Sequence, residues 1–513
     1  MLPLLALALV ATEVFDLSVY DHFELTVPAG TAGVSFRHDS GATVTAAGFD
    51  DGGPTKVRFM PTKPGTWTYP GGHLTAATAG RRGPIRVDPA HPHHFVWEGT
   101  GEHVFLNGTT AYWLLGVTDD DRIAAAIDRL AKHKVNRIRV ALNARTTGGE
   151  RWFEPQVTNS DAFKFRVDPW VNRNPGDPKK PDFDLGTFDV AMWQKLDRLV
   201  RHARDKDVLV SVIFHLDGAD VGVDPFGGGK AGMKTYAGSE AEWNYYRYAA
   251  ARLSAYSNVM WDVTNEWHLF RGQKWVNAAG GVLRAADPYK HLTTVHGRGD
   301  YPFYASPWSD FALYQQWDEA GAYQFMRTAR QLGDKVRPMP HVNEEYGYED
   351  HYPGKWGGNK KPPARAAANR AGLAWEMAFA GGYQTTGERA DVPGQGGWLT
   401  GLGDDTMTLP ALHAHMTDFF TRFEWWRCDP AELGTGHVMR VLADADRRVI
   451  AGYVRDLPDG GLPALKLPPG EYTARWYNPQ TGTWSGPVRA SGEWGITPPA
   501  CGPTGAAVLL VRE

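Results

Sequence analysis

The sequence predicts an α/β fold, a (β/α)₈ barrel with one small β-sandwich before it and another after it. Between residues 95 and 427, short apolar segments alternate with segments of helical period, as in a parallel sheet covered by helices. Residues 13–88 and 430–513 instead carry short alternating segments between turns rich in glycine, proline and aspartate. The 513 residues are enough for one barrel and two small domains.

The first region reads as all β, with no helical period. Phe23–Val27, Lys56–Met60 and Gly65–Tyr69 alternate as half-buried strands do, and a turn cluster at Asp50–Pro54 separates two of them. This pattern predicts a small β-sandwich over residues 13–88. A connector rich in proline and histidine follows at Asp88–His94.

The central region contains eight strand candidates, which favour a closed barrel over an open sheet. They are Val104–Leu106, Val135–Leu142, Val208–Phe214, Asn258–Val263, Leu292–Val295, Phe311–Tyr314, Met339–Val342 and Tyr383–Thr386. Helices are expected at Asp119–Lys132, Leu185–Asp205 and Ser239–Ala255. The glycine fingerprint of dinucleotide-binding folds and the phosphate-binding loop are both missing from this sequence.

The two ends of the chain carry simpler signals. Val449–Tyr453, Tyr472–Trp476 and Ala507–Val511 predict a second β-sandwich over residues 430–513. The apolar stretch Leu2–Ala11 is too short to span a bilayer and is typical of a signal-peptide core, although no lysine or arginine precedes it. We therefore expect a secreted or periplasmic protein from which residues 1–12 are removed.

Composition excludes several classes of protein. The net charge is −4, from 54 basic and 58 acidic residues, so the basic surface of a nucleic-acid binder is not expected. A mean hydropathy of −0.41 excludes a multi-span membrane protein. The 20 tryptophans indicate either an aromatic core or flat surfaces that stack sugars. No metal-binding or cofactor motif occurs, so we expect neither, and nothing in the sequence indicates an oligomeric state.

Functional groups of a barrel enzyme lie where its strands end. The fourth predicted strand runs into Asn265-Glu266, and the seventh runs into Asn343-Glu344-Glu345. Two carboxyl groups across one pocket are the minimum for cleaving a glycosidic bond, because one donates a proton while the other attacks the sugar. A rim glutamate that only forms a surface ion pair is the alternative. The serine nucleophile elbow and the HExxH zinc motif are missing.

With these motifs, the chain resembles the large clan of retaining glycoside hydrolases built on a (β/α)₈ barrel, clan A, which carry Asn-Glu after strand four and Glu after strand seven. Within the clan it looks like the apiosidase-like barrels of the DUF4038 type, on Phe105–Trp113, Tyr246–Trp261 and Asn343–Glu349. Gly48–Pro61 resembles the DUF5060-type sandwich that often precedes such barrels. Gly470–Pro479 resembles the sandwich of the collagen-binding type.

The resemblance implies roles for five residues. Glu266 would be the acid/base, and by register with Glu-Tyr-Gly in the clan Glu345 would be the nucleophile. Arg139 on the second strand would keep the nucleophile ionised, with a purely structural salt bridge as the alternative. Asn265 would bond the sugar 2-hydroxyl, and Tyr314 at the end of strand six would touch the nucleophile.

The neighbour of the nucleophile is expected to have no part in the chemistry. Consecutive side chains on a strand face opposite sides, so Glu344 would point away from the site.

Three further sugar contacts are expected from position alone. His215 and His296 end strands three and five, where a histidine can bond a sugar hydroxyl or simply pack. Trp398 follows strand eight and would form the floor of the −1 subsite.

The sequence thus predicts a retaining glycosidase that acts on a poly- or oligosaccharide by double displacement, with its carboxyl groups about 5–5.5 Å apart. The alternative is a secreted carbohydrate- or matrix-binding protein whose barrel has lost activity. A carbohydrate is the expected partner in both cases. The long loop at residues 143–183 is expected to decide between endo and exo action.

Overall fold

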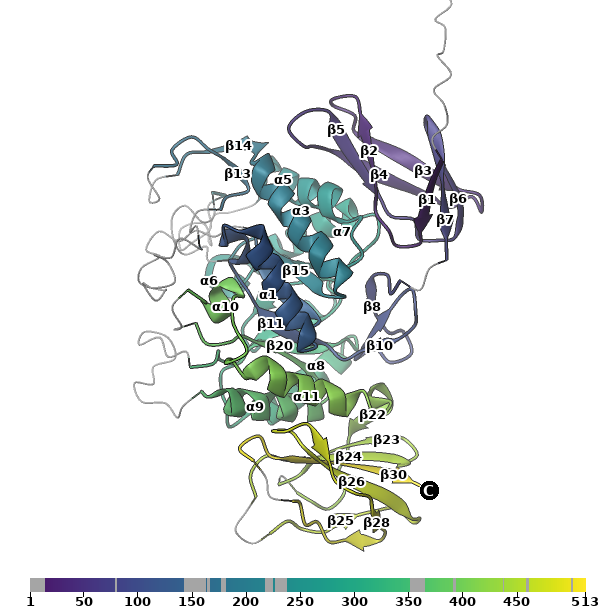
Figure 1. Cartoon of the computed structure of the whole chain (residues 1–513), viewed down its shortest axis with the longest axis vertical. Helices are drawn as coiled ribbons and strands as arrows, with labels where there is room; N and C mark the ends of the chain where they lie inside the picture. Colours follow the sequence, from purple (N-terminus) through teal and green to yellow (C-terminus); the bar gives the residue numbers. More distant parts are fainter. Residues whose placement is uncertain are drawn as a thin grey trace, which may run out of the picture.

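A barrel lies at the centre of the molecule, between an N-terminal sheet and a C-terminal sheet (Figure 1). The structure is a computed structural model that describes residues 14–78, 81–142, 163, 167–176, 181–216, 225–226, 238–350, 365–390, 394–436, 438–457, 461–499 and 502–513. The predicted signal segment and most of the loop at 143–183 lie outside the described residues.

Nine strand segments form one parallel sheet that closes into a ring of eight strands. Their order is β17-β16-β15-β12-β11-β21-β20-β19-β18. The two ends of this order, β17 (Thr293–Thr294) and β18 (His296–Gly297), are separated only by Val295 and are halves of strand five. The other strands are β11 (Asn107–Thr110), β12 (Arg137–Ala141), β15 (Leu209–Ile213), β16 (Val259–Asp262), β19 (Ala312–Gln315), β20 (His341–Glu345) and β21 (Tyr383–Thr386).

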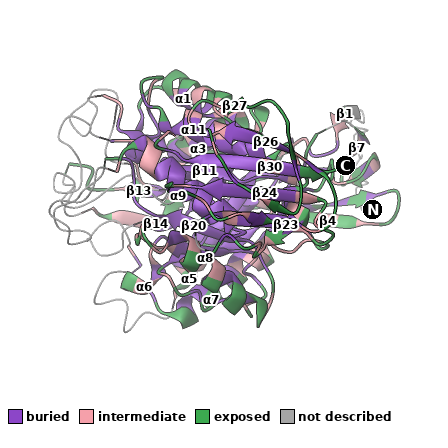
Figure 2. Ribbon diagram, turned by 90° about the horizontal axis from the view of Figure 1, so that it is seen from below, coloured by how far each residue is buried: buried purple, intermediate pink, exposed green. Residues whose placement is uncertain are grey.

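Helices surround this ring and bury their apolar faces against it (Figure 2). They are α1 (Asp120–Lys132), α3 (Val190–Asp205), α5 (Glu240–Leu253), α7 (Gln273–Ala286), α8 (Ala322–Asp334), α9 (Ala367–Phe379) and α11 (Leu409–Phe420). The side chains of Asp119, Asp189 and Ser239 cap the first three by accepting hydrogen bonds from free backbone N–H groups. Within the described part of the chain, every helix is too short or too polar to cross a membrane.

Two elements differ from the sequence-based expectation. Strand one is the polar β11, whereas Val104 belongs to β10 (His103–Val104), which pairs antiparallel with β9 (Phe95–Trp97). The predicted helix Leu185–Asp205 begins only at Val190, because Phe183–Phe188 forms β14, which pairs with β13 (Trp170–Asn172). Phe188 matched the helical spacing, yet it stacks on Tyr248 of α5 from the strand, 3.8 Å between ring centroids.

The N-terminal sheet has seven strands in the order β1-β7-β6-β3-β4-β5-β2. They are β1 (Val14–Ser18), β2 (Phe23–Val27), β3 (Gly33–His38), β4 (Thr43–Asp50), β5 (Thr55–Phe59), β6 (Gly65–Tyr69) and β7 (Gly72–Ala77). The sheet lies beside α5: the Tyr248 hydroxyl donates to the Asp50 carbonyl (2.7 Å). A three-stranded sheet of β8 (Ile85–Val87), β9 and β10 leads from it into the barrel.

The C-terminal region forms two antiparallel sheets that pack beneath α9 and α11 (Figure 1). The larger contains β22 (Cys428–Pro430), β23 (Arg440–Asp444), β24 (Val449–Val454), β26 (Tyr472–Asn478), β27 (Thr483–Trp484), β28 (Val488–Ala490) and β30 (Ala506–Arg512). The smaller pairs β25 (Leu465–Lys466) with β29 (Glu493–Trp494). Trp375 of α9 lies 5.3 Å from the Tyr453 ring and joins this region to the barrel helices. The domain boundaries near residues 88 and 430 stay predictions.

A buried ion cluster fastens the N-terminal sheet to the barrel. Arg58 of β5 donates two hydrogen bonds to the carboxylate of Asp197 on α3, at 2.7 and 2.8 Å. Arg252 of α5 donates to the same carboxylate at 2.7 Å. All three side chains are buried, so the charges depend on one another.

We expect Asp197→Ala to lower the free energy of unfolding by about 3–5 kcal/mol, because it leaves two buried guanidinium groups without their shared carboxylate. Denaturant unfolding followed by tryptophan fluorescence measures this change. The matched control is Asp205→Ala on the same helix, whose side chain is 57% exposed beside Arg204 and should matter by less than about 0.5 kcal/mol. Equal losses in the two variants would contradict the prediction.

Candidate active site

Glu266 and Glu345 lie at the same end of the barrel, after β16 and at the end of β20. Glu345 is buried and Glu266 is partly exposed. The backbone of Glu266 has φ 48° and ψ 46°, a left-handed conformation that costs energy for a residue with a side chain. Hydrogen bonds hold it there: the Glu266 N–H donates to His296 Nδ1 (3.2 Å), and the Glu266 carbonyl accepts from the Leu269 N–H (2.9 Å).

His296 connects the two glutamates. Because its Nδ1 accepts the Glu266 N–H, its Nε2 carries the hydrogen of the neutral ring, and this atom lies 3.7 Å from Glu345 Oε2. Burial and the nearby Arg139 charge hold the pKa of His296 well below its usual value, so the ring stays neutral. Within the described residues, neither His296 Nε2 nor Glu345 Oε2 has a hydrogen-bond partner. Both atoms are therefore available to a third group, such as a sugar.

The other oxygen of Glu345 is held by a tyrosine. The Tyr348 hydroxyl donates to Glu345 Oε1 and lies 3.0 Å from the Tyr112 hydroxyl. Burial raises the pKa of Glu345 above its usual value, while Arg139 and the Tyr348 hydrogen bond act in the opposite direction. Burial chiefly raises the pKa of Tyr112, and the charges of Glu345 and Glu266 add to the rise, so Tyr112 lies near both carboxyl groups.

A bulge in β20 explains why two consecutive glutamates both reach the barrel interior. Tyr314 pairs with Asn343 and Gln315 pairs with Glu345, so Glu344 is an extra residue on its strand. The expectation that Glu344 points away is therefore wrong. Its carboxylate accepts from Arg137 Nη1 (2.7 Å) and forms an ion pair with Arg139 Nε (2.6 Å), and these cations lower the pKa of Glu344.

Arg139 on β12 connects the site residues. Besides its ion pair with Glu344, it donates to Asn265 Oδ1 (3.0 Å) and to the Tyr112 hydroxyl (3.1 Å). Its positive charge lowers the pKa of Glu345 as well. The sequence placed Arg139 against the nucleophile, but its direct carboxylate partner is Glu344. Since the carbonyl oxygen of Asn265 is occupied by Arg139, the Asn265 amide N–H₂ remains as a donor to a ligand.

Tyr314 does not take the position expected from the sequence. Its side chain points out of the barrel interior, toward the surrounding helices. There its hydroxyl lies 2.8 Å from His341 Nδ1 and its ring packs on Phe325 of α8. The tyrosine beside Glu345 is instead Tyr348, three residues further along the chain. Tyr348 and Tyr112 were missed as site residues, although both lie in segments that carry the family resemblance.

His215 and Trp398 have clear surroundings. His215 is buried, and its Nε2 lies 2.8 Å from the Tyr246 hydroxyl and 3.3 Å from Glu242 Oε1, so the described contacts of this atom are to protein. Trp398 of α10 (Gly397–Thr400) stacks face to face on Tyr348, with ring centroids 4.2 Å apart and planes 5° from parallel. Trp398 therefore supports the ring of Tyr348, whose hydroxyl bonds the Glu345 carboxylate.

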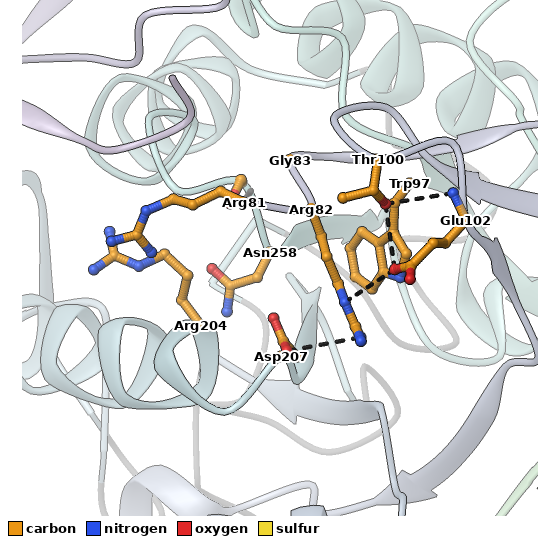
Figure 3. A pocket seen from close by; sticks show the side chains of 10 residues that line it. Arg81, Arg82, Gly83, Trp97, Thr100, Glu102, Arg204, Asp207 and Asn258 are labelled. Atoms are coloured by element: carbon orange, nitrogen blue, oxygen red, sulfur yellow. Dashed lines mark hydrogen bonds and ion pairs between the residues drawn. The ribbon is translucent and has the colours of Figure 1, made fainter. Parts of the chain in front are cut away.

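A cavity of about 430 Å³, lined by three arginines, lies at the end of the barrel opposite Glu266 and Glu345 (Figure 3). It adjoins Asp207 and Asn258, which precede the N-terminal ends of β15 and β16, the face that contributes to stability rather than to catalysis. Its three arginines already have carboxylate partners: Arg81 pairs with Asp21 (2.7 Å), Arg82 with Asp207 (3.7 Å) and Arg204 with Asp205 (3.1 Å). No unpaired charge at these arginines is left to select a ligand.

Among the described residues, no three histidine, cysteine or acidic side chains are placed to hold a metal ion. The candidate site therefore consists of Glu266 and Glu345 with Tyr112, Arg139, Asn265, His296, Glu344, Tyr348 and Trp398 around them.

Solved structures of similar shape are glycoside hydrolases. A candidate glycoside hydrolase from Bacteroides vulgatus superposes with a TM-score of 0.75 at 19% identity, over 97% of this chain and 100% of that one. A family 5 glycoside hydrolase from the same organism gives 0.63 at 14% identity, over 84% and 93% of the two chains. These identities show the shared fold.

Two curated relatives are mannanases of fungi. Mannan endo-1,4-beta-mannosidase F of Aspergillus fumigatus is 24% identical over 41% of this chain and 49% of its own length. Mannan endo-1,4-beta-mannosidase A of Podospora anserina is 23% identical over 50% and 62%. The chain thus spans about half to three fifths of the length of these relatives.

Family models match two regions of the chain. Residues 17–71 match the domain of unknown function DUF5060, as the sequence resemblance implied. Residues 91–387, the barrel with Glu266 and Glu345, match the model described as "Apiosidase-like, catalytic domain". Because this match covers more than half of the 513 residues, the chain belongs to the apiosidase-like family of catalytic domains.

Proposed function

We propose that this protein is a retaining glycosidase in which Glu266 is the acid/base and Glu345 is the nucleophile. The observation that carries the proposal is the position of His296, which accepts the Glu266 N–H and directs its own Nε2 toward Glu345 Oε2 at 3.7 Å. One small side chain thus spans from the backbone of one glutamate to the carboxylate of the other. Double displacement requires the two carboxyl groups to lie about 5–5.5 Å apart, and the short span from the Glu266 backbone to the Glu345 carboxylate supports such a separation.

The surroundings of Glu345 indicate which of its oxygens reacts. Tyr348 occupies Oε1, whereas Oε2 lacks a hydrogen-bond partner among the described residues. Oε2 attacks the anomeric carbon while Glu266 gives its proton to the departing glycosidic oxygen, and a covalent glycosyl-enzyme results. Glu266 then removes a proton from water, the water oxygen bonds the anomeric carbon, and Glu345 leaves as a carboxylate.

The groups around the carboxylates stabilise the charges that this chemistry requires. Arg139 favours the ionised form of Glu345, and Glu344 balances Arg137 and Arg139. Neutral His296 can donate from Nε2 to a sugar without adding charge. The amide of Asn265 can donate to a sugar hydroxyl beside the anomeric carbon, and Trp398 stacks on the ring of Tyr348 and supports its hydroxyl beside Glu345.

The proposed substrate is a poly- or oligosaccharide outside the cell. The mannan-degrading relatives make β-1,4-mannan the first polymer to test, followed by other plant and algal polysaccharides with sizing of the products. Among the described residues, no observation favours the binding-only alternative, and the Glu345 carboxylate has partners suited to catalysis.

Replacing either glutamate should remove activity without unfolding the protein. We expect Glu345→Gln and Glu266→Gln each to lower kcat at least about 10²–10⁴-fold on any polysaccharide that the wild type cleaves. The control is Glu424→Gln, an exposed residue paired with Arg427, which should keep full activity. Undiminished hydrolysis in both site variants, or inverted configuration of the first product by NMR, would refute the mechanism.

Tyr348→Phe should move the acid limb of the pH profile of kcat/KM to higher pH. The reason is that the Tyr348 hydroxyl lowers the pKa of Glu345, so its loss keeps the nucleophile protonated at higher pH. Glu344→Gln should move the same limb to lower pH, because the Glu344 charge raises the pKa of Glu345. Shifts in the same direction, or an unchanged limb in both variants, would contradict the assignment of Glu345.

A further inference from the structure

We propose that Glu242 of α5 is a positioning residue that holds the segment Thr264–Arg271, and with it Glu266, from behind the catalytic end. The proposal rests on the acid/base role proposed for Glu266. It adds a function for a buried acid that no part of the mechanism uses.

Glu242 is fully buried, and both of its oxygens are engaged. Oε1 accepts from the Tyr246 hydroxyl (3.0 Å) and lies 3.3 Å from His215 Nε2, and Oε2 accepts from Trp275 Nε1 (3.1 Å). In the sequence, Ser239 and Glu242 have the spacing of a helix capping box, in which the glutamate would turn back to the cap. Here the Ser239 hydroxyl does accept the Glu242 N–H, while the carboxylate reaches into the barrel wall.

The first connection to the acid/base segment runs through His215. Its ring contacts Glu242, and its carbonyl oxygen accepts from the Asn265 N–H (2.8 Å) and the Thr264 hydroxyl (3.1 Å). The residue directly before Glu266 is therefore tied to a histidine whose ring position depends on Glu242.

The second connection runs through Arg271, at the other end of the same segment. Arg271 Nη2 lies 3.7 Å from Glu242 Oε1, and its guanidinium lies over the ring of Trp275, 4.5 Å from the centroid. The Arg271 N–H also donates to the Trp267 carbonyl (2.7 Å), closing the short helix α6 (Trp267–Phe270) that follows Glu266. One carboxylate is thus connected to the chain on both sides of the acid/base, directly at Arg271 and through His215 at Thr264 and Asn265.

This double attachment matters because Glu266 has an unfavourable backbone conformation that its surroundings must maintain. If the segment relaxes, the Glu266 carboxyl group moves relative to the glycosidic oxygen, and a displacement of about 1 Å can cost about 100-fold in rate. The attack by Glu345 would be unaffected, since the Glu345 carboxylate is held by Tyr348.

The two roles can be separated by the leaving group of the substrate. Protonation by Glu266 is needed for a poor leaving group such as phenol but not for 2,4-dinitrophenol. We would measure kcat/KM for phenyl and 2,4-dinitrophenyl β-mannosides, or for the same pair on the sugar that the polysaccharide screen identifies, with wild type, Glu242→Leu, Glu242→Gln and Glu266→Ala.

Glu242→Leu should lose about 10–100-fold on the phenyl glycoside and less than about 3-fold on the dinitrophenyl glycoside. Glu242→Gln should keep most of the wild-type rate at acid pH. Burial raises the pKa of Glu242 to about 7, so the wild-type side chain is protonated at acid pH and the amide resembles it. The matched control is Glu240→Gln on the same helix, 78% exposed beside Arg247, which should change neither rate.

A substrate-free measurement checks the mechanical part. Hydrogen–deuterium exchange of the peptide containing residues 263–271 should be at least about 10-fold faster in Glu242→Leu than in wild type, with the peptide containing Glu345 unchanged. Equal rate losses on both glycosides, no loss at all, or unchanged exchange at 263–271 would overturn the proposal. If Glu266→Ala shows no preference for the dinitrophenyl substrate, the result refutes the acid/base role of Glu266 itself, independently of the results for the Glu242 variants.

Discussion

The charge of a buried guanidinium must be balanced by nearby polar and acidic groups, and the candidate site is arranged around the guanidinium of Arg139. The side chain is fully buried and reaches Glu344, Asn265 and Tyr112. Burying a charge without such partners costs several kcal/mol, so each of these groups is held in place by the need to satisfy the arginine. The result is a rigid set of polar groups that sets the charge of Glu345 and orients the residue next to Glu266.

Much of this arrangement could be predicted from the sequence. Strands β15 and β16 consist mainly of apolar residues, so their positions follow from composition, and helices α1 and α5 begin at capping residues that the sequence shows. The carboxyl ends of parallel strands meet at one end of a barrel, which brings Glu266 and Glu345 together. Asn265 follows because it adjoins Glu266 in the chain.

The remainder depends on register and packing that a single sequence does not display. One extra residue in β20 turns Glu344 inward, and alternation along a strand gave the opposite expectation. Tyr314 lies near the end of a strand as expected, but that position did not determine which side of the sheet its side chain takes. The tyrosine that bonds Glu345 is Tyr348. Strand one was placed too early because Val104–Leu106 is more apolar than the polar residues that pair in the ring.

The place where the barrel closes has a consequence for the order of folding. The ring is completed when strand one pairs with strand eight, which brings Asn107 of β11 beside Gln384 of β21. The contact between the hydroxyls of Tyr112, just after β11, and Tyr348, just after β20, depends on that closure. Pairing between segments so far apart in the chain is slow relative to helix formation. Refolding molecules should therefore regain their helical signal before they regain the tyrosine contacts that support Glu345, so catalytic competence reports a late step of assembly.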